Sequence, residues 1–227
     1  MDVELSMKSF PIVTVAGTLV WMAVSTWLAP SAAATAAGPS FDCSKARGSI
    51  EQLICEDEAL SAVDRTMASV YAAASRKAVD ERPHVLRAEQ RGWIKGRNDC
   101  WKSSAPRACV EGSYQLRIAA LQARYHLVHA TGPMSYTCED DSRSELVATL
   151  FATDPPTVVV ERGDRVSLMF LQPSASGAKY AGGNESFWEH QGEAFLTWGH
   201  GTPEIRCVRK RTQDGSTHER TTPRTDR

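Results

Sequence analysis

The stretch VVVERGDRVSLMF, residues 158–170, decides the fold class of the second half of the chain. Two runs rich in β-branched and apolar residues flank Arg162-Gly163-Asp164, which is typical of a tight hairpin turn. The same period of two continues outward, in the runs Leu146–Leu150, Phe187–Trp188, Phe195–Trp198 and Ile205–Val208. Short strands with frequent turns predict a small antiparallel barrel or sandwich, whose first and last strands Cys138 and Cys207 would link.

The first half of the chain has a helical period instead. Ser49 and Asp57 are the predicted N-caps of a short and a longer helix, and Pro83 marks the next turn. Apolar side chains recur at three- and four-residue spacing, at Ile54, Leu60, Met67, Leu86, Tyr114, Ile118 and Leu121. Thr131-Gly132-Pro133 indicates a linker. We therefore expect an α + β protein of two domains, an antiparallel helical array over residues 41–128 and a β-domain over residues 134–210.

The cysteines indicate disulfides. All six follow residue 37, and an even number in an exported chain predicts a disulfide framework. Cys100–Cys109 would close a short turn and is the simplest pair in the helical half, where the sequence leaves three pairings open. Cys43–Cys55 would complete this choice only if the chain between them doubles back, because a straight helix would hold the sulfurs too far apart.

Residues 1–37 have the pattern of a secretory signal. Lys8 precedes the apolar run Phe10–Leu28, and an alanine-rich segment follows Pro30. We expect cleavage near Ala37 and a soluble periplasmic protein without stable membrane insertion. The alternative is an uncleaved signal that anchors the chain, since the apolar run approaches the length of a membrane span. Cys43 follows Phe41-Asp42, which is the wrong context for lipid attachment.

The charge pattern points to a protein partner. The formal net charge of −1 at pH 7 does not indicate binding to nucleic acid or to a membrane surface. Acidic residues outnumber basic ones between Cys138 and Lys210, which suits a basic partner, whereas the helical half leans basic. Residues 211–227 lack large apolar side chains and are predicted to form a disordered tail.

One polar motif stands out in the β-domain, Ser176-Gly177-Ala178-Lys179-Tyr180. Gly177 allows an unusual backbone dihedral or a close approach to another molecule, and Tyr180 can anchor the loop. The Lys179 ammonium can pair with a carboxylate. Spacing alone is equally consistent with an ordinary turn next to a surface lysine.

The segment Tyr136–Arg209 resembles the C-type lysozyme inhibitor family, the MliC/PliC proteins. The resemblance rests on Tyr136-Thr137-Cys138, on the 176–180 motif, on Phe187-Trp188, on Gly192-Glu193-Ala194 and on Cys207. The first half resembles the N-terminal domain of LprI-type lysozyme inhibitors. The matching residues there include Cys43, Glu51, Cys55, Asp64, Tyr71, Gln90, Trp93, Arg97, Cys100, Cys109, Tyr114 and Arg117.

The resemblance implies a barrel of about eight strands whose serine-glycine loop enters the cleft of a C-type lysozyme. A muramidase cleft holds one protonated acid and one carboxylate, and a serine hydroxyl can donate to and accept from such groups. The lysozyme-binding residues that it implies are Ser176, Gly177, Ala178, Lys179, Tyr180, His190 and Gln191. Gln191 stands where the family usually has a lysine that contacts the cleft carboxylates. Lys179, or protonated His190, would then supply the cation.

Two other classes of function compete with inhibition. A periplasmic envelope adaptor would bind other exported proteins or glycan without inhibiting lysozyme. A hydrolase has little support, because the sequence shows no nucleophile elbow, metal motif or paired carboxylates, so we expect no catalytic residue, metal or cofactor. Trp93 is predicted to be a packing anchor of the helices, and Arg97 to pair locally or to cap a helix end.

Overall fold

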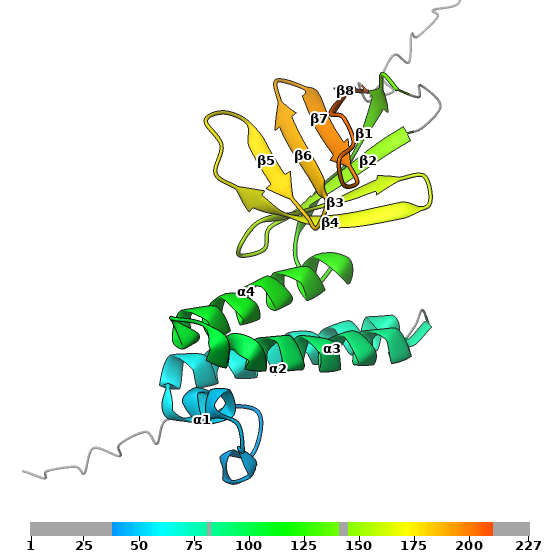
Figure 1. The fold of residues 1–227 in the computed structure, drawn as a ribbon. Helices are drawn as coiled ribbons and strands as arrows, with labels where there is room; N and C mark the ends of the chain where they lie inside the picture. Colours follow the sequence, from blue (N-terminus) through cyan, green and yellow to red (C-terminus); the bar gives the residue numbers. More distant parts are fainter. Residues whose placement is uncertain (1–37, 81–82, 141–144, 211–227) are drawn as a thin grey trace, which may run out of the picture. The chain divides into compact units, whose positions relative to one another are not determined.

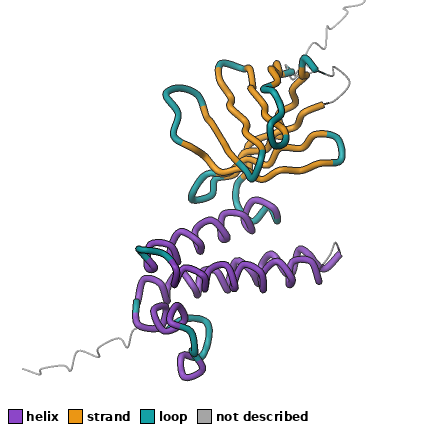
Figure 2. Tube along the Cα trace, viewed as in Figure 1, coloured by secondary structure: helices purple, strands orange, loops and turns teal. Residues whose placement is uncertain are grey.

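The computed structural model describes residues 38–80, 83–140 and 145–210. Within these residues four α-helices and three short 3-10 turns precede eight β-strands (Figure 1 and Figure 2). The predicted signal at 1–37 and the predicted tail at 211–227 lie outside the described residues. None of the helices in the described part of the chain is long and apolar enough to cross a bilayer.

The helices form an array around one apolar core. They are α1 (Ser49–Glu56), α2 (Glu58–Lys77), α3 (Pro83–Asn98) and α4 (Pro106–Arg124), with 3-10 turns at Cys43–Lys45, Ala78–Asp80 and Asp99–Lys102. Each of the first three packs against α4. The largest fully buried side chains of this core are Tyr114, Ile54, Leu60, Leu86, Leu121 and Val110. The apolar residues at helical spacing in the sequence are therefore the ones that are buried in this core.

The helix starts show which caps the sequence predicts correctly. Asp57 is the N-cap of α2, as predicted, and its Oδ1 accepts the backbone N–H of Leu60 at 3.0 Å. The prediction for Ser49 is wrong, because the N-cap of α1 is Gly48 and Ser49 is the first helical residue. Gly48 has no side chain with which to cap the helix, and only the carboxylate half of a capping box, from Glu51 at N3, is present there. The Glu51 carboxylate accepts the N–H of Gly48 at 3.3 Å.

Three disulfides join the six cysteines in the pairs predicted. Between Cys43 and Cys55 the chain does double back, because a 3-10 turn at Cys43–Lys45 leads into an extended segment before α1. The two Cα atoms thereby lie 6.0 Å apart. The second pair, Cys100–Cys109, joins the turn after α3 to the first part of α4.

The β-strands close into one antiparallel barrel in which each strand pairs with its neighbours in the chain. They are β1 (Ala130–Cys138), β2 (Glu145–Phe151), β3 (Thr157–Arg162), β4 (Arg165–Gln172), β5 (Ala178–Ala181), β6 (Glu185–His190), β7 (Glu193–Trp198) and β8 (Ile205–Arg209). Closure occurs where β8 pairs with β1, and Cys138 lies directly opposite Cys207. The disulfide between them therefore links the first strand to the last, and the predicted fold class is confirmed.

Alternating side chains fill the barrel. Tyr136, Leu146, Phe187 and Leu196 are among those that are fully buried inside it. The predicted hairpin is confirmed, since Arg162 of β3 pairs with Arg165 of β4 across a two-residue turn. The apolar residues that alternate along the sequence thus point into the barrel, and the residues between them lie on its outer face.

The linker predicted at Thr131-Gly132-Pro133 is wrong, because these residues belong to β1. Thr131 pairs with Leu150 of β2, and the register shifts before Met134 pairs with Ala148. Proline lacks the N–H that a regular ladder needs, so it is tolerated in a strand at such an irregularity. The strand consequently continues through a sequence that usually ends one.

Candidate functional site

The motif at 176–180 connects β4 to β5. Residues 173–177 form an exposed connection, and Ala178–Tyr180 lie in β5, which pairs with β6. Ala178 is opposite Glu189, so the connection lies beside the end of β6, where His190 leads into the turn before β7. The structure therefore brings the predicted residues of the two segments together at one end of the barrel.

Gly177 is the point of closest approach between the connection and β6. Its φ of +65° lies in the left-handed region that favours glycine. A Cβ added there would lie 2.2 Å from the backbone oxygen of Glu189 and 3.1 Å from Nδ1 of His190. Only a residue without a side chain allows the connection to press this closely on the strand.

Two hydrogen bonds fix the backbone of the connection. The indole Nε1–H of Trp188 donates to the carbonyl oxygen of Ser176 at 2.9 Å. The Ser174 hydroxyl donates to the carbonyl oxygen of Gly177 at 3.0 Å. The Ser176 hydroxyl itself makes no hydrogen bond within the described residues. The loop is thus held through its main chain, and its serine side chain is exposed and available to a partner.

Lys179 lies on the outer face of the barrel. It pairs with Trp188 across β5 and β6, one position from the buried pair Tyr180 and Phe187, so alternation directs its side chain outward. Trp188 stacks on His190 with ring centroids 5.8 Å apart and contacts Phe195 at 5.4 Å. Lys179 takes part in no ion pair within residues 38–80, 83–140 and 145–210, so its ammonium is free to meet another molecule.

Tyr180 is the inner anchor of the motif. Its side chain is 5% exposed and belongs to the core of the barrel. Burial raises the pKa of its phenol, and the negative charge of Glu189 acts in the same direction. The ring remains neutral and apolar at neutral pH. It therefore tethers β5 from inside the barrel.

His190 and Gln191 belong to the turn between β6 and β7. His190 pairs with Glu193, and Gln191 and Gly192 between them have φ values of 53° and 83°. Two successive residues with positive φ are typical of the type I′ hairpin turn. Gln191 is exposed, whereas the His190 ring stacks on Trp188 and both rings lie close to Gly177.

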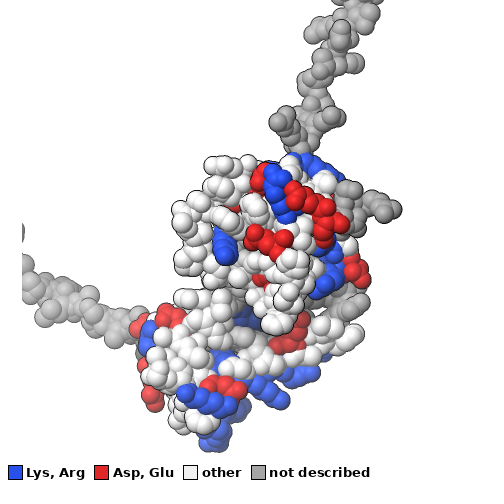
Figure 3. Space-filling view, turned by 45° about the horizontal axis from the view of Figure 1, so that its top comes forward, with Lys and Arg blue, Asp and Glu red and all other residues white. Residues whose placement is uncertain are grey.

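Most other charges of the barrel are already paired. Arg206 binds both Glu139 and Glu193, Lys210 binds Glu145 at 2.9 Å, and Arg162 binds Asp140 at 2.5 Å. Figure 3 shows acidic and basic side chains next to each other on the barrel, with wide areas free of charge between them. The pairing with Arg206 holds the pKa of Glu193 below its ordinary value. Lys179 therefore differs from Lys210, the other lysine described in the barrel.

One polar cluster of the helical array was not predicted from the sequence. Asp64, Arg97 and Tyr114 are buried together, with hydrogen bonds of 2.6 Å from Tyr114 to Asp64 and from Arg97 to Tyr114. Arg97 also contacts its neighbour Asn98, as a local pairing would predict. The available signal was Asp64 itself, which lies at helical spacing between Leu60 and Met67 on an otherwise apolar face. No group of three or more potential metal ligands gathers in the described part of the chain.

The comparisons with known proteins match both halves separately. A family model described as membrane-bound lysozyme-inhibitor of c-type lysozyme matches residues 136–205. A second model, described as lysozyme inhibitor LprI, matches residues 43–130. The two matches follow the division between the helices and the barrel.

Relatives extend the match across both halves. Proteins named lipoprotein LprI from Mycobacterium bovis and Mycobacterium tuberculosis are 32% identical over 161 residues, which is 70% of this chain and 80% of theirs. The chain therefore belongs to the LprI family of lysozyme inhibitors.

Proposed function

We propose that this chain inhibits a C-type lysozyme by inserting the loop at residues 173–177 into the muramidase cleft. The proposal is supported by one observation: the backbone of this loop is held in place, while polar side chains there are available to a partner. The loop backbone is bound by Trp188 and Ser174, while the Ser176 hydroxyl in the loop and the Lys179 ammonium on the adjoining strand β5 have no partner in the described structure. A stiff loop with free polar groups loses little conformational entropy when it binds.

The chemistry of the free groups suits the chemistry of the cleft. A muramidase holds one protonated acid and one carboxylate on either side of the sugar that it cleaves. The Ser176 hydroxyl can accept a hydrogen bond from the acid and donate one to the carboxylate. The Lys179 ammonium adds a charge-assisted hydrogen bond. The loop would occupy the space of the substrate without offering a bond to cleave.

The surroundings of His190 favour Lys179 as the cation of the proposed site. The His190 ring is stacked on Trp188 and lies next to the backbone of Gly177. Lys179 is exposed on the outer face. We therefore assign the cation to Lys179 and a supporting role to His190. Gln191, at the exposed tip of the neighbouring turn, offers an amide where the family usually has a lysine, and its contact would be a neutral one.

Inhibition of this kind takes place outside the cytoplasm. The relatives are named lipoproteins, whereas the first cysteine of this chain is Cys43, in a disulfide with Cys55. A cysteine in a disulfide cannot carry a thioether-linked lipid. We propose export through the signal at residues 1–37, with the protein free in the periplasm after cleavage. The excess of acidic residues in the barrel would favour encounter with a basic enzyme.

A turbidity assay tests the proposal. The purified chain should slow the lysis of cell-wall preparations by a C-type lysozyme. Ser176→Ala and Lys179→Ala should each raise the inhibition constant by about tenfold or more, with little change in thermal stability because neither side chain has a partner in the structure.

Matched changes in the helices provide the controls. Ser69→Ala and Lys95→Ala remove the same groups from exposed positions of α2 and α3 and should leave inhibition unchanged. If the wild-type chain binds lysozyme without slowing lysis, it is an adaptor and not an inhibitor. If both loop variants inhibit as well as wild type, the loop is not the inhibitory element.

A further inference from the structure

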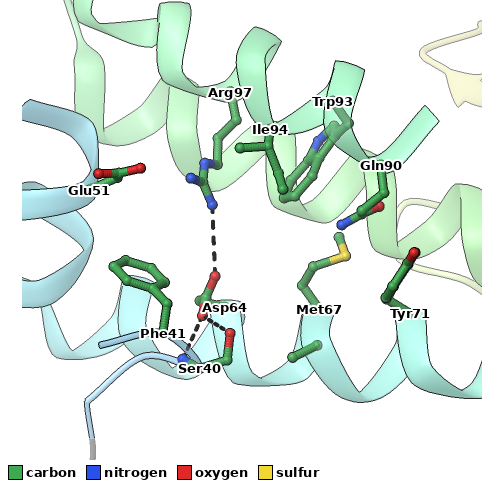
Figure 4. A pocket seen from close by; sticks show the side chains of 11 residues that line it. Ser40, Phe41, Glu51, Asp64, Met67, Tyr71, Gln90, Trp93, Ile94 and Arg97 are labelled. Atoms are coloured by element: carbon green, nitrogen blue, oxygen red, sulfur yellow. Dashed lines mark hydrogen bonds and ion pairs between the residues drawn. The ribbon is translucent and has the colours of Figure 1, made fainter. Parts of the chain in front are cut away.

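The helical array contains a cavity, open to solvent on one side, that the proposed inhibition does not use. Its volume is about 350 Å³, and α1, α2, α3 and the segment before α1 line it (Figure 4). Most of the wall is apolar or aromatic, from Phe41, Met67, Tyr71, Trp93 and Ile94. A cavity of this size with aromatic walls falls within the range of sites for small organic molecules.

The polar groups at one end of the cavity are already satisfied. Asp64 accepts hydrogen bonds from Ser40 N–H at 2.7 Å, from the Ser40 hydroxyl at 2.6 Å and from the Tyr114 hydroxyl at 2.6 Å. Arg97 donates to the Tyr114 hydroxyl and to Asn98, and its guanidinium lies 3.8 Å from Asp64. The charges of Asp64 and Arg97 offset each other, so this end of the cavity has no net charge. The hydrogen bonds hold its side chains in place.

The other end presents polar groups without partners. The Gln90 Oε1 accepts a hydrogen bond from Arg117 Nε at 3.1 Å, which fixes the amide and leaves its NH₂ group free. The Tyr71 hydroxyl makes no hydrogen bond within the described residues. Figure 4 shows the Gln90 nitrogen directed toward the space above Met67, and the Tyr71 side chain rising from the opposite helix at the same end of the cavity. Two hydrogen-bonding groups from different helices therefore lie at this end of the cavity.

The ring of Trp93 is held in place beside these groups. Its indole N–H donates to the backbone oxygen of Ser113 at 3.2 Å, and its edge packs on Tyr114 with centroids 5.2 Å apart. Arg97 lies over the same ring at 5.4 Å. A fixed aromatic surface can stack on the apolar C–H face of a sugar ring, while the neighbouring amide and hydroxyl bind its polar substituents.

The lining distinguishes between chemical classes of ligand. A fatty acyl chain would bury the Gln90 amide and the Tyr71 hydroxyl without partners, which is costly. A phosphate or carboxylate ligand would meet Asp64 and Glu51 and would find Arg97 already engaged. A neutral ring that carries hydroxyl groups, one amide and one small apolar substituent satisfies both the polar groups and the apolar wall.

We propose that the helical array binds an N-acetylated sugar ring in this cavity. The acetamide carbonyl would accept from the Gln90 NH₂ group, and its methyl group would pack against Met67 and Ile94. The Tyr71 hydroxyl would bind a ring hydroxyl, and the ring would stack on Trp93. This site is independent of the loop at 173–177, because all its lining residues precede residue 98.

Calorimetric titration of the full chain with chitotriose tests the proposal, with cellotriose as the sugar that lacks the acetamide groups. We expect saturable, weak binding of chitotriose, with a dissociation constant of roughly a millimolar or lower, and binding of cellotriose at least about tenfold weaker. Absence of saturable binding, or equal binding of the two sugars, would overturn the proposal.

Two variants test the assigned groups. Gln90→Glu keeps an oxygen for Arg117 but replaces the NH₂ donor, and Tyr71→Phe removes only a hydroxyl. Each should weaken chitotriose binding by about fivefold or more, whereas Gln115→Glu at an exposed position of α4 should not change it. Unchanged binding by Gln90→Glu and Tyr71→Phe, with folding verified by circular dichroism, would contradict this assignment. The same variants should inhibit lysozyme like wild type, so failure of the sugar site and failure of the inhibitory loop are measured separately.

Discussion

The β4–β5 loop and the cavity of the helical array hold their polar groups in opposite ways. In the loop the main chain is bound, by Trp188 and Ser174, and the side chains of Ser176 and of Lys179 on the adjoining strand have no partner among the described residues. At one end of the cavity the side chains of Asp64, Arg97 and Tyr114 bind one another in a buried network.

The difference follows from the shapes of the two sites. A loop that enters another protein's cleft must keep its side chains available, so only its backbone can provide stiffness. A recess can be stiffened by side chains on one wall because its ligand contacts other groups, here Gln90 and Tyr71. Backbone changes should therefore damage the loop most, and side-chain changes the cavity.

The largest expected effect is the loss of unfolding free energy on removing a disulfide, and it should differ between the barrel and the helices. Cys138–Cys207 spans 69 residues and Cys100–Cys109 spans 9. Replacing the first pair by serine should cost about 4 kcal/mol of unfolding free energy, and replacing the second about 2.5 kcal/mol. Denaturant unfolding followed by circular dichroism measures both. An equal or reversed order would show that chain entropy does not set the contribution of the barrel disulfide.

Gly177→Ala is expected to have the next largest effect. The added Cβ meets the Glu189 backbone oxygen at 2.2 Å, and the backbone has φ of +65°. We expect a loss of about 1–3 kcal/mol of stability and at least a tenfold weaker inhibition, measured by thermal unfolding and by the turbidity assay.

Gly163→Ala is the matched control for this variant. Gly163 has nearly the same φ, +61°, but nothing lies within 4 Å of the added Cβ. Gly163→Ala therefore has the same unfavourable backbone dihedral but no steric clash, and it should inhibit like wild type. If the two alanine variants inhibit equally, the close packing of the loop on β6 is not what positions it.

A smaller effect is expected from the tryptophan that anchors the loop. Trp188→Phe keeps an aromatic ring beside Lys179 but removes the hydrogen bond to the Ser176 oxygen. The cost should be about 0.5–1 kcal/mol of stability, with inhibition several-fold weaker because the loop becomes more mobile. Trp93→Phe removes the corresponding indole donor in the helices, to Ser113, and should leave the inhibition constant unchanged.

The smallest effect concerns the cap of α1 and depends on pH. Hydrogen bonds from the backbone N–H groups of Arg47 and Gly48 hold the pKa of Glu51 below its ordinary value. A lowered folded-state pKa stabilises the fold above the unfolded pKa, near 4.3, and this stability is lost as the pH falls through the folded value. Glu51→Gln should therefore be less stable than wild type at pH 7 by under about 1 kcal/mol, and the difference should shrink below pH 4 or so.

The exposed Glu56, at the other end of α1, provides the comparison. Glu56→Gln should show little difference from wild type across the same pH range in urea denaturation. A stability gap for Glu51→Gln that does not change between neutral and acidic pH would contradict the role assigned to its carboxylate.

Local patterns in the sequence predicted most of the fold. The turn at Gly163-Asp164 and the cap at Asp57 depend on neighbouring residues, and the even number of cysteines predicted that disulfides form. The start of β1 was not predicted, since Gly132-Pro133 normally interrupts a strand and the irregularity there depends on the register with β2.

In the two candidate sites, too, contacts between distant segments could not be predicted from local sequence. The motif at 176–180 can be seen in the sequence, but its anchor at Trp188, twelve residues away, depends on how β5 pairs with β6. Trp93 packs on the helical core as predicted. Arg97 reaches Tyr114 on another helix, which spacing along the chain does not reveal. Packing between elements, and not local propensity, sets these contacts.

A crystal structure of the chain in complex with a C-type lysozyme is the decisive test of loop insertion. We expect the loop at 173–177 inside the cleft, with the Ser176 hydroxyl within about 3 Å of a catalytic carboxyl group and the Lys179 ammonium next to the carboxylate. A complex in which the cleft is open to solvent and the barrel contacts lysozyme elsewhere would contradict it.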